Sequence, residues 1–92
     1  MIRSFRNPRV ELLFTDHEVP AFRAIERIAR RTLLYLHQAR RLDDLRAPPG
    51  NRLEALKENR TGQYSMRIND RWRICFRWEN GDAVDVEIVD DH

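Results

Sequence analysis

The last third of the chain combines a series of arginines with a carboxylate and a histidine. The chain stops on Asp90-Asp91-His92, directly after an apolar stretch. Guanidinium groups bind phosphate oxygens in pairs of hydrogen bonds, and carboxylates and histidines transfer protons at a reacting group. Together these residue types can hold a phosphodiester and move protons around it, which indicates an RNA substrate. The arginines of this stretch are Arg67, Arg71, Arg73 and Arg77.

The elements that must position these groups follow from an alternation of apolar and polar residues. Three runs alternate with a period of two, and Asn-Asp and Asn-Gly pairs separate them, which predicts an antiparallel meander. One face would cover a core, and the polar face would point outward or toward a ligand. The apolar positions are Tyr64, Met66 and Ile68, then Trp72, Ile74, Phe76 and Trp78, then Val84, Val86 and Ile88.

Side-chain parity predicts the register of the second hairpin. A two-residue turn at Asn80-Gly81 would place Phe76 opposite Asp85 and mix apolar with charged side chains on one face. We therefore expect a three-residue loop, residues 79–81, with Gly81 in a left-handed conformation. The expected pairs are Phe76 with Val84, Ile74 with Val86, Trp72 with Ile88, and Arg73 with Glu87.

The same parity argument applied to residues 69–71 places Arg67 opposite Arg73. Like charges directly across a sheet are unfavourable. Either Glu87 screens the pair or an anionic ligand binds there, while a solvated face of mixed charges is the plainer interpretation.

The first sixty residues predict helices. Pro8 fits the first turn of a short helix to about Phe14, and Pro20 can open a long helix to about Ala39. Residues 42–45 favour a further helical turn, and Ile2 to Phe5 favours a strand at an edge. The apolar positions of the long helix are Phe22, Ile25, Ala29, Leu33 and Leu36, at helical spacing. The prediction is a single α+β domain over residues 1–92, with the N-terminal strand and two to three helices packed on the C-terminal antiparallel sheet.

Positive charge is concentrated in the first sixty residues. They carry thirteen basic and eight acidic side chains, whereas the rest carries four basic and seven acidic ones. Four arginines share a second face of the long helix: Arg23, Arg27, Arg30 and Arg31. Such a face suits a phosphate backbone or an acidic protein, although a solvated face is the usual explanation for a helix.

The composition limits the cellular compartments in which the protein is expected and the kinds of site that it can form. Cys75 is the only cysteine, so no internal disulfide is possible and a reducing cytoplasm is expected. No apolar stretch predicts a signal peptide or a membrane span. Cys75, His17, His37 and His92 show no metal-ligand spacing, and His17 and His37 are expected at the surface.

Nearly the whole chain resembles the HigB-type toxins of the RelE superfamily of toxin–antitoxin ribonucleases. The matching segments are Met1-Ile2-Arg3-Ser4-Phe5, Pro48-Pro49-Gly50-Asn51-Arg52-Leu53-Glu54-Ala55-Leu56, Gly62-Gln63-Tyr64-Ser65-Met66-Arg67-Ile68-Asn69-Asp70, Arg71-Trp72-Arg73-Ile74-Cys75-Phe76 and Val86-Glu87-Ile88-Val89-Asp90-Asp91-His92. The Asn-Asp-Arg-Trp-Arg block with the acidic and histidine ending is its most specific part.

The resemblance implies a toxin that enters the ribosomal A site and cuts mRNA during translation. It also implies a HigA-type antitoxin with a helix-turn-helix domain, and operator DNA bound only through the toxin–antitoxin complex. No metal or organic cofactor is expected. The implied reaction is attack of the RNA 2′-hydroxyl on the adjacent phosphate, which leaves a 2′,3′-cyclic phosphate and a 5′-hydroxyl.

That reaction needs a base, cations for the pentacovalent phosphorane, and an acid for the leaving oxygen. By resemblance, Lys57 and Arg73 match the cation positions, and Asp90 and His92 match positions near the proton transfers. The arginines expected to bind RNA are Arg52, Arg67, Arg71 and Arg77.

Two positions depart from the resemblance. Asp91 stands where many relatives carry an active-site tyrosine, and loss of a proton-transfer group typically costs about 10²–10⁴-fold in rate. Glu54 stands where some relatives carry histidine, and it can still serve as a base. The expected function is a nuclease weakened by Asp91; the alternative is a disabled module that binds ribosome or antitoxin without cutting. DNA binding by the basic helix ranks lower, since no helix-turn-helix spacing is present.

Overall fold

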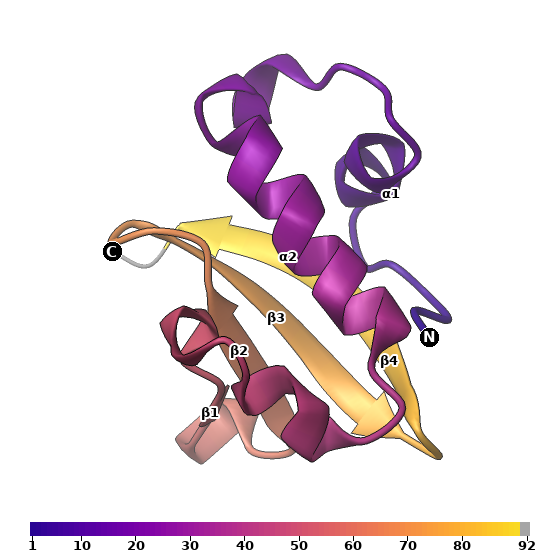
Figure 1. Ribbon diagram of the computed structural model, residues 1–92, viewed down its shortest axis with the longest axis vertical. Helices are drawn as coiled ribbons and strands as arrows, with labels where there is room; N and C mark the ends of the chain where they lie inside the picture. The colour runs from indigo at the N-terminus through magenta and orange to yellow at the C-terminus, as the bar shows by residue number, and fades with distance from the viewer. Residues whose placement is uncertain (91–92) are drawn as a thin grey trace.

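A four-stranded antiparallel sheet lies at the centre of the computed structural model, which describes residues 1–90 (Figure 1). Its strands follow the sequence order β1 (Glu54–Ala55), β2 (Gln63–Arg67), β3 (Trp72–Glu79) and β4 (Asp82–Asp90). The three longer strands coincide with the three alternating runs, so the predicted meander is confirmed. The short β1 adds a fourth strand at the β2 edge.

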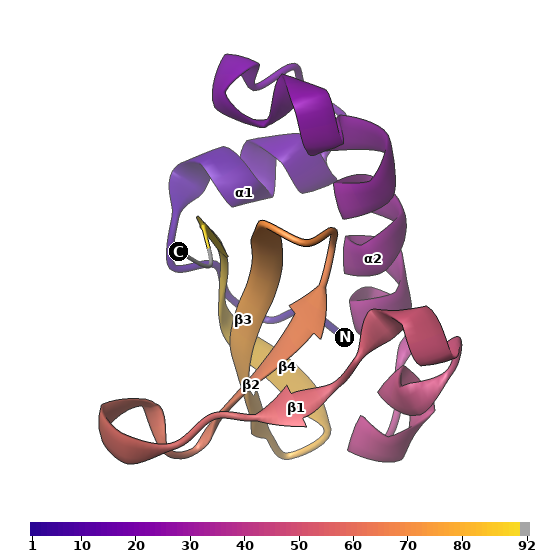
Figure 2. The ribbon, with the colours of Figure 1, turned by 90° about the vertical axis from the view of Figure 1, so that its left-hand side faces the viewer.

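Two helices cover one face of the sheet, as an α+β arrangement requires (Figures 1 and 2). The first is α1 (Pro8–Phe14), with Asn7 Oδ1 accepting from the Arg9 backbone N–H as its N-terminal cap. The second, predicted from Pro20, begins as a 3₁₀ helix (Pro20–Ile25) and becomes α-helical only in α2 (Glu26–Gln38). Among residues 1–90, no helix has the length and apolar character needed to cross a bilayer.

The hydrophobic core lies between these helices and the inner face of the sheet. All five apolar positions predicted for the long helix are buried, and so are Met66, Ile74, Phe76 and Val86 on the strands. The rings of Phe22 and Trp72 meet edge to face, 5.9 Å apart. Each fully buried side chain of this size contributes roughly 1.5–3 kcal/mol, so this face supplies most of the fold's driving force.

The N-terminal segment lies along the free edge of β4, where a strand was predicted. It forms two isolated parallel bridges, Ile2 with Ala83 and Phe5 with Val86, rather than a continuous strand. The Ile2 N–H donates to His37 Nδ1 at 3.2 Å. His37 is therefore half-buried and ties this segment to α2, which corrects the expectation of a surface histidine.

Three short 3₁₀ turns connect α2 to β2. They span Leu42–Arg46, where a helical turn was predicted, then Pro49–Asn51 and Glu58–Arg60. Asp44 Oδ2 accepts from the backbone N–H groups of Arg40 and Arg41, both at 3.0 Å. These bonds favour the ionised carboxylate and lower the pKa of Asp44.

The prediction of a three-residue loop between β3 and β4 is wrong. Asn80 and Gly81 both have positive φ, 52° and 82°, as a two-residue hairpin turn of the primed type requires. Glu79 pairs with Asp82 across this turn, and the register then shifts between Arg77 and Cys75.

A bulge in β4 explains how a two-residue turn is compatible with the pattern. Asp85 has φ 53° and lies in the irregular stretch opposite Phe76. The extra residue restores the inward alternation, so that parity is corrected within the strand rather than in the loop. The resulting pairs are Cys75 with Glu87, Ile74 with Ile88, Arg73 with Val89, and Trp72 with Asp90.

Candidate active site on the outer face of the sheet

A cavity of about 180 Å³ opens on the sheet face opposite the helices. Direct cross-strand partners share a face, so Ser65 with Cys75 and Arg73 with Val89 form its floor. The chain between β1 and β2 supplies the other side and projects away from α2 in Figure 2. The lining residues are Glu54, Leu56, Arg60, Ser65, Arg73, Cys75 and Val89.

Arg73 is held firmly in this cavity. Its Nε and Nη2 donate to the Ser65 hydroxyl at 3.0 and 2.7 Å, and Nη2 also reaches the Arg52 carbonyl at 3.4 Å. Its side chain is only 15% exposed. A guanidinium fixed before a ligand arrives needs little reorganisation to stabilise developing negative charge.

Glu54 brings a carboxylate to the mouth of the same cavity. Its Oε2 lies 3.6 Å from Arg73 Nη2, and its side chain is 58% exposed. The backbone reverses before it because Arg52 adopts a left-handed φ of 45° after the Pro49–Asn51 turn. This reversal pairs Glu54 with Ser65. The structure thus brings two of the predicted catalytic residues together.

Asp90 lies with another arginine at the end of β4. Its carboxylate accepts from Arg71 at 2.8 Å, and this hydrogen bond raises the pKa of Arg71. Asp90 pairs with Trp72, so the register assigns it to the inner face, whereas Arg73 shares the outer face with Val89. The Arg71 guanidinium also lies over the Trp72 ring, 5.5 Å from its centre. Asp91 and His92 lie outside the described residues.

The remaining predicted residues lie around the cavity rather than in its lining. Lys57 is exposed just beyond β1, before the Glu58–Arg60 turn. Arg77 is exposed on β3 with Asp85 4.0 Å away. Arg52 is exposed and contributes its carbonyl to Arg73.

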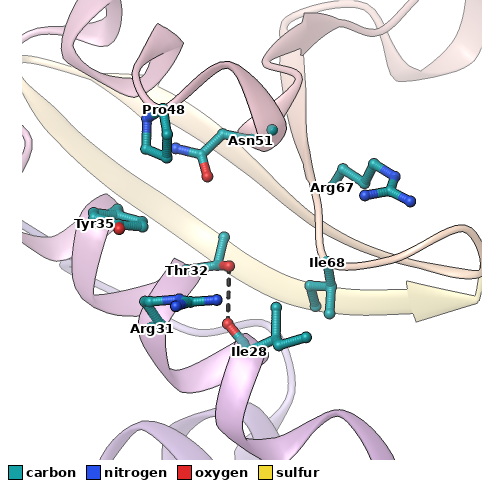
Figure 3. A pocket seen from close by; sticks show the side chains of 9 residues that line it. Ile28, Arg31, Thr32, Tyr35, Pro48, Asn51, Arg67 and Ile68 are labelled. Carbon is teal, nitrogen blue, oxygen red and sulfur yellow. Dashed lines mark hydrogen bonds between the residues drawn. The ribbon is translucent and has the colours of Figure 1, made fainter.

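Arg67 is at the border of a second cavity, of about 380 Å³, between α2 and the Pro49–Asn51 turn, and its side chain points away from that cavity (Figure 3). In Figure 3 it lies on the strand side, across from Arg31 and Thr32 of α2. Its guanidinium pairs with Asp70 and lowers the pKa of that carboxyl. Thr32 is occupied by its own helix, donating to the Ile28 carbonyl at 2.9 Å.

Arg67 and Arg73 are direct partners, as predicted, yet Glu87 does not screen them. Each has its own acceptor, Asp70 for Arg67 and Ser65 for Arg73. The repulsion is relieved locally on each side. Neither Glu87 nor a ligand is needed to explain the pair.

One arginine of the basic face predicted for the long helix, Arg30, makes structural contacts within the fold. Arg30 donates to the carbonyls of Leu13 at 3.0 Å and His17 at 2.8 Å, and it pairs with Glu26. Because it joins α2 to the end of α1, it is a structural residue. The exposed arginines of this face are Arg23, Arg27 and Arg31.

Only two of the seven residues that line the outer cavity, Glu54 and Arg73, were predicted as site residues. The missed residues with polar or thiol side chains are Arg60, Ser65 and Cys75. Parity could have found Ser65 and Cys75, since both alternate with the core positions of their strands. Both are buried although they belong to the nominally polar face. Nothing local marked Arg60, because it belongs to a polar connection whose path only the folded chain defines.

Comparisons with known proteins agree with this architecture. Residues 3–92 match the family described as "RelE-like toxin of type II toxin-antitoxin system HigB". Toxin HigB-1 of Vibrio cholerae serotype O1 is 34% identical over 90 residues, which cover 94% of this chain and 93% of that protein. Endoribonuclease HigB of Proteus vulgaris is 34% identical over 95 residues, covering 100% of both chains. The chain therefore belongs to the RelE-like HigB toxins of type II toxin–antitoxin systems.

Proposed function

We propose that this toxin is a ribosome-dependent endoribonuclease that cuts mRNA at the A site. The observation that carries the proposal is the outer cavity, where Arg73 is fixed by Ser65 and lies beside the Glu54 carboxylate. A prepositioned cation next to a proton acceptor supplies two of the three kinds of group that RNA cleavage by the 2′-hydroxyl needs, the cation and the base. The printed name of the Proteus vulgaris relative, Endoribonuclease HigB, supports RNA as the substrate.

The proposed reaction breaks one phosphodiester bond without cofactor. Glu54 accepts the 2′-hydroxyl proton while the 2′-oxygen bonds to phosphorus, and Arg73 stabilises the added charge on the phosphorane. The bond from phosphorus to the 5′-oxygen then breaks, and His92 donates a proton to that oxygen. The products are a 2′,3′-cyclic phosphate and a 5′-hydroxyl.

The other predicted residues receive supporting roles in this proposal. Lys57 supplies a second cation, and Asp90 and Asp91 provide carboxylates directly before His92 in the sequence. Four arginines bind the RNA strand on either side of the reacting phosphate: Arg52, Arg67, Arg71 and Arg77. Because the Asp90 carboxylate is bound by Arg71, changes at Arg71 should also affect the end of β4.

A type II toxin is paired with an antitoxin. We propose that the partner is of the HigA type, with a helix-turn-helix domain through which the complex binds operator DNA. The cytoplasm is the proposed location, since ribosome and mRNA are the proposed targets.

Asp91 favours a second candidate function. A carboxylate cannot donate a hydrogen bond as a phenol does, and it adds negative charge beside a phosphate. A toxin scaffold with weakened or absent chemistry would still bind its antitoxin or the ribosome. The two candidates differ in whether the chain cuts as written.

The test adds purified protein to a translating ribosome–mRNA system and maps new 5′ ends. The variants are Arg73→Ala, Asp91→Tyr, and Arg27→Ala as an exposed arginine outside the cavity. We expect weak A-site cleavage by the natural chain and an increase in its rate of up to about 10²–10⁴-fold in Asp91→Tyr. Arg73→Ala should not cleave. Cleavage only by Asp91→Tyr would favour the disabled scaffold. No cleavage by either form, or full activity of Arg73→Ala, would overturn the proposed site.

A further inference from the structure

Arg60 brings a second guanidinium to the outer cavity from a different element. It ends the Glu58–Arg60 turn between β1 and β2 and lines the same cavity as Arg73 of β3. Two guanidiniums from independent elements converge there, although the reaction proposed above gives a role to Arg73 and none to Arg60. The structural environment of Arg60 indicates what the second one does.

Glu87 and Gln63 hold the Arg60 guanidinium in place. Arg60 Nη2 donates to Gln63 Oε1 at 2.9 Å and to Glu87 Oε2 at 3.0 Å. The Glu87 side chain is 17% exposed, and the same Oε2 also accepts from Arg6 Nη1, again at 3.0 Å. A partly buried carboxylate that pairs with two cations is constrained by both, and its hydrogen bond to Nη2 orients the Arg60 guanidinium.

The cluster of Arg6, Arg60 and Glu87 retains a net positive charge and hydrogen-bond donors that Glu87 does not use. Two guanidiniums share one carboxylate, so Arg6, Arg60 and Glu87 together carry a net positive charge. Arg60 Nε is buried and has no acceptor among residues 1–90. Both hydrogen bonds of Arg60 to Gln63 and Glu87 leave from Nη2, so they do not use every donor of the guanidinium.

We propose that Arg60 is a second phosphate-binding residue of the cavity and that Glu87 is the positioning residue that holds it there. The identity of the ligand as RNA rests on the proposed function. Arg60 is partly neutralised by Glu87, and it therefore binds a phosphate neighbouring the reacting one in ground state and transition state alike. Arg73, beside Glu54, acts on the reacting phosphate.

The matched pair Arg60→Ala and Arg6→Ala tests the binding role. Each removes one 3.0 Å ion pair to Glu87, but only Arg60 lines the cavity. The probe is a short, fluorescein-labelled, single-stranded RNA whose 2′-O-methyl groups prevent cleavage, titrated at several salt concentrations. Losing one phosphate contact lowers the slope of log affinity against log salt by about 0.7 in Arg60→Ala, whereas Arg6→Ala keeps the natural slope. Equal slopes in all three proteins, or no binding by the natural chain, would overturn the inference.

Two substitutions at Glu87 test the positioning role. Glu87→Gln keeps an acceptor oxygen and should retain the natural affinity for the probe, while Glu87→Ala should lose as much as Arg60→Ala does. If Glu87 merely neutralised charge, both variants would bind more tightly than the natural chain, and the positioning role would be wrong. Thermal unfolding of each variant ensures that only folded proteins are compared.

The cleavage assay separates this inference from the proposed function. Arg60→Ala should raise KM at unchanged kcat, as expected for lost uniform binding. If the natural chain cleaves and Arg60→Ala equals it in KM and in probe affinity, the inference alone fails. If no form cleaves but binding of the RNA probe still depends on Arg60, the proposed phosphate site is supported and the proposed nuclease function fails.

Discussion

The two faces of the sheet are built from the same strands but by different means. The inner face packs Met66, Ile74 and Phe76 under α2 at zero exposure. The outer face places Ser65, Arg73 and Cys75 at the alternate positions, under a partial cover from the chain between β1 and β2. One face is a continuous apolar layer, and the other holds a small cavity into which two arginines and one carboxylate converge.

The difference shows that alternation specifies a core more completely than it specifies a site. An apolar face needs only burial, which is non-directional and tolerates small shifts. A site needs particular donors at particular distances. Those distances depend on chain segments outside the strands, which the alternating pattern does not describe. The following predictions test this contrast, from the largest expected effect to the smallest.

Neighbouring residues on β3 should separate the faces most strongly. Phe76→Ala removes a fully buried ring from the inner face and should cost about 3–5 kcal/mol of unfolding free energy. Arg77→Ala, the next residue on the outer face, should stay within about 0.5 kcal/mol. Urea unfolding of both variants measures this, and equal losses would mean that the outer face is as structural as the inner one.

Arg73→Lys should affect activity more than stability. Lysine keeps the positive charge but loses the planar fork that donates twice to Ser65. We expect cleavage to fall by about 10²–10³-fold, the usual cost of one lost transition-state donor. Initial cleavage rates with translating ribosomes measure the effect, and Arg27→Lys is the control, since Arg27 is an exposed arginine outside the cavity. A wild-type rate in Arg73→Lys would show that charge alone suffices.

The contrast between structural and available arginines extends to α2. Arg30→Ala removes hydrogen bonds to the Leu13 and His17 carbonyls and should cost about 1.5–3 kcal/mol. Arg27→Ala removes an exposed side chain of the same helix and should be near neutral. Chemical denaturation distinguishes them. If Arg27→Ala also destabilises, the exposed face of α2 contributes to the fold.

The smallest effect is expected at the rim of the outer face, where Arg67 lowers the pKa of Asp70 below its ordinary value of 3.8. A depressed carboxyl pKa contributes stability above that value, and the contribution is lost as the pH falls through the folded-state pKa. The natural chain should therefore unfold at slightly higher urea than Asp70→Asn at neutral pH, and the difference should vanish in acid. A difference that persists in acid would assign it to packing.

Much of the fold could be predicted because its signals are local. The three strands, the short helix from Pro8 and the buried stripe of α2 follow from periodicity and from proline positions. The pairing of Arg67 with Arg73 also followed from parity. The predicted loop of the second hairpin was wrong. An Asn-Gly turn followed by a bulge at Asp85 satisfies the same alternation as a longer loop, and parity alone cannot distinguish the two.

The candidate site was less predictable, residue by residue. Arg73 and Glu54 were identified from the family resemblance and lie 3.6 Å apart in the fold. Arg60 escaped notice since its partner Glu87 is 27 residues away in the sequence. Asp90 was expected near the reaction, and its contact with Arg71 follows from the bulge-shifted register that no local pattern specifies.

The sequence by itself determined the three longer strands, the short helix from Pro8, the buried stripe of α2 and the family that the chain resembles. Those properties depend on neighbours within a few residues and on burial, which is tolerant of detail. Only the tertiary structure decided which arginines remain available. Arg30 is used to join α2 to α1, Arg67 is drawn to Asp70, and Arg60 and Arg73 converge on one cavity. Guanidinium pairing depends on distances of about 3 Å between residues remote in the chain, and such distances exist only after folding.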